Sequence, residues 1–419
     1  MKKLLSLSVA AATIFTLVSC SGNDVNTNAD GSGASVVPPI VEDNIIDTTQ
    51  QSKIDAISIW DTAGTVTGGG VYDIGYSVTL TATANDGYRF TMWDDGVTDA
   101  QRVVEARDST VYTALFEAVA ETDASVFTYE ATPLGAVITS YMGTDPIIRI
   151  PQKIQGLAVV KLGDKCFDSN TTLCCVSLSD GITEIQDRAF WHCTNLRSVS
   201  ISGTVKSIGS KAFWQCSSLS SINIPEGVES LGDYAFNCCH ALKDVTFPST
   251  LTTLGRYIFF YCESLESFEV ALGNTAYTSY DGVLFTKDMS TIVAYPNALN
   301  DQYTLPTHTT KVGNGAFATC SSLKSVTLHG AVTSVGNYAF YDCKAITAAV
   351  IPSSVTSIGS KAFSDCTALT SLTVPDSVST VGEDVLAGSS AIESIKTPSS
   401  SAFAQWCITN GLSDKIVNN

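Results

Sequence analysis

Residues 208–225 read IGSKAFWQCSSLSSINIP, and variants of this phrase recur from about residue 185 to residue 396. Each copy has an apolar residue and Gly, two variable positions, Ala-Phe, two variable positions and Cys. A Leu and an alternating apolar stretch follow, often closed by Pro. Self-similarity at a fixed period of this size predicts a solenoid, in which each repeat forms one rung of a stack.

The cysteine of the phrase marks the period of the repeat. Neighbouring cysteines are 23 residues apart, except for one interval of 58 residues. The column extends to Asn170 and Ser389, which predicts about nine rungs with atypical ones at both ends. The members of this column are Asn170, Cys193, Cys216, Cys239, Cys262, Cys320, Cys343, Cys366 and Ser389.

A structural role explains this column better than a metal site or a disulfide framework. A small thiol with a weak S–H donor suits a tight interior turn whose backbone carbonyls need partners. Zinc sites use clustered ligands, and stacked side chains that point the same way are poorly placed for disulfides. We therefore predict a ladder of structural thiols. The roles of the other cysteines stay open, and these are Cys166, Cys174, Cys175, Cys238 and Cys407.

Within one repeat, the alternation over residues 219–224 predicts a short strand with one buried face. The Ala-Phe phrase is long enough only for a helical or 3-10 turn. No rung buries its own apolar residues, so stability must come from stacking the rungs on each other.

The N-terminus reads as an export signal. Lys2 and Lys3 precede an apolar run that is too short to span a membrane, and Leu-Val-Ser-Cys ends at Cys20. This ending resembles the lipobox of bacterial lipoproteins, which implies cleavage after residues 1–20 and acylation of Cys20. An ordinary signal peptide with an incidental Cys20 is the alternative.

The segment 21–52 is rich in Ser, Gly, Asn and Asp, which predicts a flexible tether. The net charge of −18 argues against binding to nucleic acid and against docking on anionic lipid headgroups.

Residues 53–119 have the pattern of a small antiparallel β domain. Strand-like runs are separated by Asn-Asp-Gly and Asp-Asp-Gly turns. The order of their motifs resembles the divergent internalin-type B-repeat, which implies a β-grasp-like spacer. We expect Tyr88, Phe90 and Trp93 to be core aromatics, and a sugar-binding platform is the alternative reading.

Residues 120–419 resemble the BspA-like leucine-rich repeats of bacterial surface proteins, with a lead-in hairpin over 127–151. The resemblance implies a leucine-rich repeat solenoid with short parallel strands on its concave face and short helical or 3-10 turns on its convex face. The long cysteine interval places a 35-residue insertion at about 271–305, which reads as a β-hairpin.

The sequence carries no recognisable catalytic motif. Its four histidines, His192, His240, His308 and His329, stand in unrelated positions. No nucleophile elbow, zinc-protease or phosphate-binding motif is present. We predict no enzyme, no cofactor and no metal.

The variable positions of the repeat are therefore the candidates for ligand binding. The positions before Ala-Phe and just after Phe hold aromatic and cationic residues, which dominate binding hot spots. The candidate binding residues are Trp191, Trp214, Phe260, Tyr341, Tyr234, Tyr257, Arg188 and Lys211. A second surface is the Ser- and Thr-rich outer side of the strands, which either binds through hydroxyls or only keeps the sheet soluble.

The leading hypothesis is a monomeric outer-membrane lipoprotein at the cell surface, held by its N-terminal lipid. Its repeats would bind an extracellular protein or glycan, and the family resemblance implies adhesion. The alternative is a structural or accessory scaffold lipoprotein, and an enzyme is a distant third.

Overall fold

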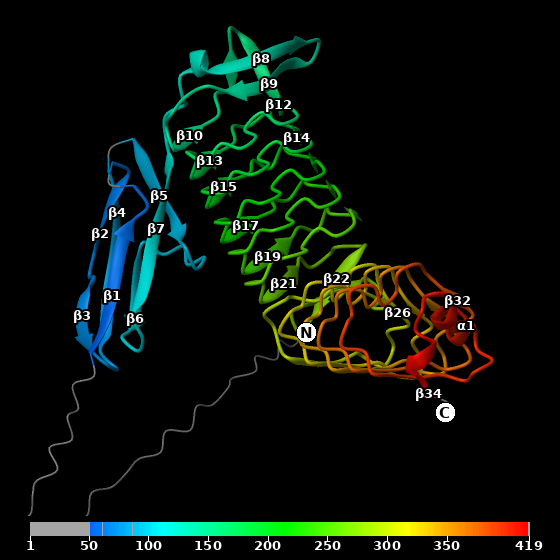
Figure 1. Cartoon of the computed structure of the whole chain (residues 1–419). Helices are drawn as coiled ribbons and strands as arrows, with labels where there is room; N and C mark the ends of the chain where they lie inside the picture. The colour runs from blue at the N-terminus through cyan, green and yellow to red at the C-terminus, as the bar shows by residue number, and fades with distance from the viewer. Residues whose placement is uncertain (1–50, 61, 86, 418–419) are drawn as a thin grey trace, which may run out of the picture. The chain divides into compact units, whose positions relative to one another are not determined.

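The computed structural model describes residues 51–60, 62–85 and 87–417 (Figure 1). The predicted signal peptide, Cys20 and nearly all of the predicted tether lie outside these residues. The described chain confirms the predicted architecture of a leucine-rich repeat solenoid preceded by a small β domain.

The N-terminal β domain consists of two sheets that enclose one core. Its strands are β1 (Gln51–Ser58), β2 (Gly64–Thr67), β3 (Gly70–Asp73), β4 (Ser77–Ala84), β5 (Tyr88–Trp93), β6 (Gln101–Glu105) and β7 (Thr110–Ala118). The sheets run in the order β3-β1-β7-β5 and β2-β4-β6. The expectation of a purely antiparallel domain is wrong in one respect, because β1 and β7 pair in parallel.

The aromatic residues of β5 belong to the core of this domain. Trp93 and Phe116 are fully buried. Phe90 lies edge-on to both, with ring centroids 5.8 and 5.9 Å away. These contacts favour the packing role over an exposed platform.

The solenoid begins with a hairpin of β8 (Phe127–Thr132) and β9 (Gly135–Tyr141), which η1 (Ala124–Val126) precedes. β12 (Leu157–Leu162) pairs in parallel with β9 and antiparallel with β11 (Lys153–Ile154). This hairpin supplies the first strands of a sheet that continues through the repeats.

Each repeat contributes a three- or four-residue strand to what we call the first ladder. Its strands are β10 (Ile147–Arg149), β13 (Cys175–Ser177), β15 (Ser198–Ser200), β17 (Ser221–Asn223), β19 (Asp244–Phe247), β21 (Ser267–Val270), β25 (Gln302–Thr304), β27 (Ser325–Thr327), β29 (Ala348–Val350), β31 (Ser371–Thr373), β33 (Ser394–Lys396) and the shorter β34 (Ile416–Val417). Neighbours pair in parallel at a fixed offset, as in Ser198 opposite Cys175. The middle residue is usually buried and its neighbours point outward, as the alternation predicts.

A second ladder of short strands runs along the apolar-Gly positions. It comprises β12, β14 (Glu184–Ile185), β16 (Ser207–Ile208), β18 (Ser230–Leu231) and β20 (Thr253–Leu254), then β24 (Thr291–Ala294), β26 (Lys311–Val312), β28 (Ser334–Val335), β30 (Ser357–Ile358) and β32 (Thr380–Val381). The solenoid has about 12 turns, so the expectation of about nine rungs is too low. The cysteine column does not mark rungs such as those of β10 and β25, which have no such cysteine.

The segment between the two ladders forms tight turns instead of helix. The residue before Ala-Phe and the second residue after Phe both adopt the left-handed conformation, with φ of 57° at Arg188 and 59° at His192. Two left-handed residues so close together prevent a helix from propagating. Within the described residues, α-helix is confined to α1 (Ala402–Thr409), and the 3-10 helix η2 (Ser413–Lys415) follows it.

The 58-residue interval holds an additional rung as well as a hairpin. β22 (Tyr277–Tyr280) and β23 (Val283–Thr286) pair antiparallel, and β23 pairs antiparallel with β24. β24 then joins the second ladder and β25 the first. In Figure 1 this segment lies where the colour changes from green to yellow.

The inserted strand β23 divides the hydrophobic core. Leu284 packs in the cluster of the N-terminal rungs, whereas Val283 and Phe285 pack in that of the C-terminal rungs. Alternate residues of one strand therefore belong to two cores, as expected where both faces of a strand are covered.

Candidate ligand-binding surface

The cysteine column lies inside the solenoid and bonds one rung to the preceding one. The thiol of Cys216 donates a hydrogen bond to the carbonyl oxygen of Phe190, 3.2 Å away. Cys239, Cys262, Cys343, Cys366 and Cys193 make the same bond to the Phe of the preceding rung, at 3.0–3.2 Å. The hydroxyl of Ser389 makes it in the last rung, at 2.6 Å from the oxygen of Phe363.

Two members of the column differ from this pattern. Cys320 lies 3.8 Å from the carbonyl of Tyr295 and 3.6 Å from the Asn297 side chain. Asn170 instead accepts from the backbone amides of Thr172 and Leu173 through its side-chain oxygen. The ladder geometry is therefore regular only between full rungs.

Burial also sets the chemistry of these thiols. It raises the pKa of Cys193 and of Cys366 to about 12, and holds the pKa of Cys216 well above its ordinary value. Every described cysteine is a free thiol. The described residues include no cluster of three or more His, Cys, Asp or Glu that could hold a metal ion.

Aromatic rings on the turns form a connected row across several rungs. The ring of Trp214 lies 5.5 Å from that of Tyr234, which lies 5.4 Å from Tyr257. Tyr257 also contacts Phe260 at 4.9 Å and Tyr338 at 5.1 Å. We call these residues, with the Tyr341 ring and two lysines, the turn-face strip; its members are Lys211, Trp214, Tyr234, Tyr257, Phe260, Tyr338, Tyr341 and Lys361.

Cations flank this strip. The Lys211 ammonium lies 4.8 Å from the ring centre of Trp214 and 5.7 Å from that of Tyr234. Lys361 lies 5.8 Å from Tyr338 at the other end of the strip. Amines held over ring faces gain a favourable cation–π interaction and keep the aromatic surface accessible from the side.

The strip is half-buried, with one exception. Phe260 is 9% exposed, and the other aromatic members are intermediate. Burial raises the pKa of the Tyr234 and Tyr257 hydroxyls, so both stay neutral and able to donate at neutral pH.

Arg188 and Trp191 lie beside this strip without joining its ring contacts. Arg188 forms an ion pair with Asp164 at 3.2 Å, and Lys165 lies 5.6 Å from the ring centre of Trp191. The indole N–H of Trp191 is buried and has no hydrogen-bond partner among the described residues. Six of the eight candidate residues are thus brought together, and these two form a separate pair.

Tyr338, Lys361 and Gly315 were not among the candidates, although they lie in the same sequence columns. Gly315 replaces the bulky residue that other rungs place before Ala-Phe. A Cβ at Gly315 would lie 2.6 Å from Cε1 of Phe260 and 3.0 Å from Cδ1 of Tyr257. This glycine lets the strip continue across the insertion, and the 58-residue offset was the signal that locates it.

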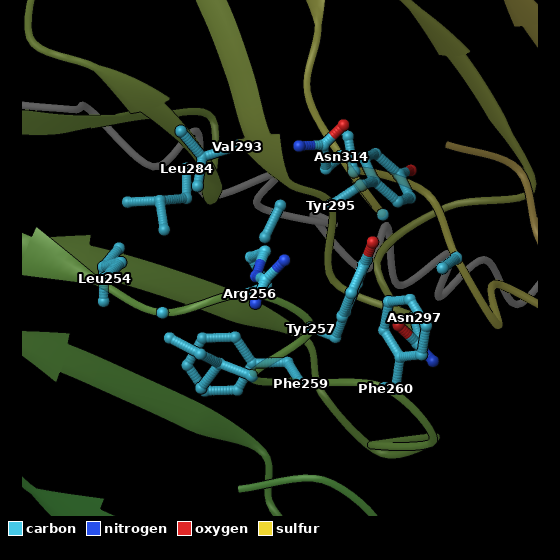
Figure 2. Close-up of a pocket in the computed structure, with 16 residues that line it drawn as sticks. Leu254, Arg256, Tyr257, Phe259, Phe260, Leu284, Val293, Tyr295, Asn297 and Asn314 are labelled. Atoms are coloured by element: carbon cyan, nitrogen blue, oxygen red, sulfur yellow. The ribbon is translucent and has the colours of Figure 1, made fainter. Parts of the chain in front are cut away.

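A cavity of about 160 Å³ lies beside the strip at this point. Figure 2 shows Leu254, Leu284 and Val293 around one end of it, and Tyr257 and Phe260 toward the other. Polar groups on its wall include Asn297 and Asn314. The Arg256 side chain, also in the wall, is bound to Asp233 by two hydrogen bonds of 3.3 and 3.0 Å.

The strand face is less uniform than a simple hydroxyl-rich column. Ser177 and Ser198 are buried, and the Ser177 hydroxyl donates to Glu117 at 2.7 Å. Farther along, Ser267 donates to Asp244 at 2.6 Å. These hydroxyls already have partners within the protein, which favours the structural reading of this face.

The histidines remain apart in the folded chain. His240 forms an ion pair with Glu263, and His329 lies 2.6 Å from the carbonyl of Pro306. Among the described residues, no helix is long and apolar enough to cross a membrane.

Comparison with known protein families identifies the repeats. Residues 149–280 and 294–411 match the BspA type leucine rich repeat region, in six copies. The chain belongs to this family. Residues 58–120 match the divergent InlB B-repeat domain, so both resemblances seen in the sequence are confirmed.

Solved structures show the same fold. A leucine-rich repeat protein from Eubacterium ventriosum is 25% identical, with a TM-score of 0.54 over 64% of this chain and 78% of its own. The pneumococcal vaccine antigen PcpA is 21% identical, with a TM-score of 0.54 over 66% of this chain and 81% of its own. No curated protein matches the sequence.

Proposed function

We propose that this BspA-type repeat protein is a non-catalytic surface lipoprotein that binds an extracellular protein or glycan through its turn-face strip. The supporting observation is the unbroken row of ring contacts from Trp214 to Tyr341. Trp and Tyr give large contact area at a low entropic cost, and they are enriched in binding hot spots. The repeats would act as a monomer in adhesion.

The cysteine column has a structural role in this proposal. Its thiols are buried and directed at backbone carbonyls, so they stabilise the rungs that carry the strip. The division into residues 53–119, residues 120–419 and an insertion at 271–305 belongs to the same proposal. A scaffold lipoprotein is the alternative, and the binding experiment distinguishes the two.

We expect Trp214→Ala to weaken binding about 10- to 30-fold, the loss typical of a hot-spot residue. The experiment is a binding screen of purified matrix proteins and glycans, followed by titration of each positive with the variant. Trp60→Ala is the matched control, because Trp60 is 45% exposed and lies in the β domain. If the wild type captures nothing, or if Trp214→Ala binds as well as the wild type, the strip is not the binding surface and the scaffold role is favoured.

The anchor is tested separately from the ligand. We expect Cys20→Ser to abolish incorporation of labelled palmitate and to release the protein from the membrane fraction. Protease added to intact cells should cut the repeats of the wild type. Repeats that survive on intact cells and are cut only after lysis would place the protein inside the outer membrane, against an adhesive role.

A further inference from the structure

The turn face is incomplete in one rung of the solenoid. From Thr291 in β24 to Lys311 in β26 the offset is 20 residues, whereas it is 23 between Ser207 and Ser230. Tyr295 takes the position of the repeat phenylalanine, because its amide donates to the Ala316 carbonyl at 2.7 Å. It follows Ile292 by three residues, whereas Phe213 follows Ile208 by five. The two residues that form the left-handed corner of other rungs are therefore missing here.

The cavity of Figure 2 occupies the place of that missing corner. One wall is the turn at 254–260, the opposite wall is the turn at 314–318, and residues 293–297 close the base. Its volume of about 160 Å³ is close to that of an apolar cavity known to hold one benzene molecule. It therefore has room for one aromatic or branched aliphatic side chain.

The missing corner also leaves backbone groups without their usual partners. In complete rungs, the corner amide donates to the next rung, as from Tyr234 to the Arg256 carbonyl at 2.9 Å. Within the described chain, the amides of Tyr257 and Phe259 and the carbonyl of Asn314 have no such protein partner. Two donors two residues apart, opposite an acceptor, form the pattern that an extended backbone can pair with.

We propose that this cavity binds an extended polypeptide segment of a partner protein, with one aromatic or leucine side chain inserted between the two turns. The backbone of the segment pairs with the Tyr257 and Phe259 amides and with the Asn314 carbonyl. Because Asp233 already pairs with Arg256, the site does not call for an acidic side chain. This inference rests on the proposed binding function and narrows its ligand from protein or glycan to polypeptide.

The test uses the blocked tripeptide N-acetyl-Gly-Phe-Gly-amide as a probe of the full chain. Calorimetry measures its affinity, and hydrogen exchange monitors residues 255–262. We expect the probe to slow exchange of that segment and not of residues 232–239, whose corner amides are already bonded. Toluene, an ester analogue of the tripeptide and triacetylchitotriose should each bind at least about tenfold more weakly, a difference of 1.4 kcal/mol.

Ala318→Leu is the decisive variant, because Ala318 lines the cavity and is 4% exposed. We expect it to weaken tripeptide binding at least about tenfold. Ala387→Leu is the matched control, since Ala387 has the same position after the repeat phenylalanine and is exposed. Unfolding curves establish that both variants are folded; if Ala318→Leu is not, Ala294→Leu in the same wall replaces it.

The inference is overturned if the tripeptide does not bind, if it binds Ala318→Leu with unchanged affinity, or if the ester, toluene or sugar binds equally well. The outcomes separate it from the broader proposal. If the tripeptide fails while Trp214→Ala still loses a macromolecular ligand, the strip binds and the cavity does not. If the tripeptide binds but no macromolecule is captured, the proposed function fails on its own.

Discussion

We expect Phe213→Ala to lower the free energy of unfolding by about 4 kcal/mol. Phe213 is fully buried between Phe190 and Phe236, with ring centroids at 5.1 and 5.3 Å and nearly parallel planes. The backbone ladders hold the rungs at a fixed spacing, so neighbouring rings cannot move in to fill the space. Truncation would therefore remove packing contacts and leave a cavity inside a continuous column.

Urea unfolding followed by circular dichroism measures this effect. Because each rung contacts only its neighbours, a weak rung can uncouple the two sides of the array, which would split the transition or reduce its slope. Trp214→Ala is the comparison, since Trp214 follows Phe213 directly but is only half-buried. A loss in Phe213→Ala no larger than that in Trp214→Ala would show that the phenylalanine column does not stabilise the stack.

The sequence predicts this column because its register is exact. Phe167 to Phe259 stack with near-parallel rings, and Phe317 to Phe363 do so again after the insertion. Identical residues at a constant spacing must share one environment in a stack, so periodicity alone places them inside. The cysteines beside them follow the same logic, down to Ser389, whose hydroxyl replaces the thiol.

The second ladder could not be predicted in the same way. Its strands are mostly two residues long, as in Ser207–Ile208, and so short a run shows no alternation. The left-handed corners were also hidden, because they hold Arg, Lys and Tyr where Gly, Asn or Asp would be the usual signal. Tyr234 keeps φ of 59° only because the hydrogen bonds to adjacent rungs determine its backbone.

The additional rung and the cavity were hidden for a different reason. Tyr295 replaces the repeat phenylalanine and Asn297 faces the thiol of Cys320, so neither marker residue of the phrase is present. Counting from cysteine to cysteine then reads one short rung and one hairpin as a single insertion. Candidate residues from single columns were found, but their contact across that rung depends on Gly315 and on three-dimensional stacking.

The glycine that follows the apolar residue of each rung should be nearly as sensitive as the phenylalanine. We expect Gly232→Ala to lower the free energy of unfolding by about 3 kcal/mol, the upper end for overpacking. An added Cβ would lie 2.6 Å from the carbonyl carbon of Gly209 and against the amide of Ser210. Both are backbone atoms of the preceding rung, so no side chain can rotate away and the ladder itself must open.

Gly330→Ala is the matched control for this substitution, because its Cβ would meet no atom within 4 Å. Urea unfolding of the two variants separates the contact from the general effect of replacing glycine, which by itself is slightly stabilising. Equal stability of the two variants would contradict close packing of the second ladder. Since Tyr234 lies two residues after Gly232, a displaced rung should also break the Trp214–Tyr234 contact, so Gly232→Ala should weaken ligand binding whereas Gly330→Ala should not.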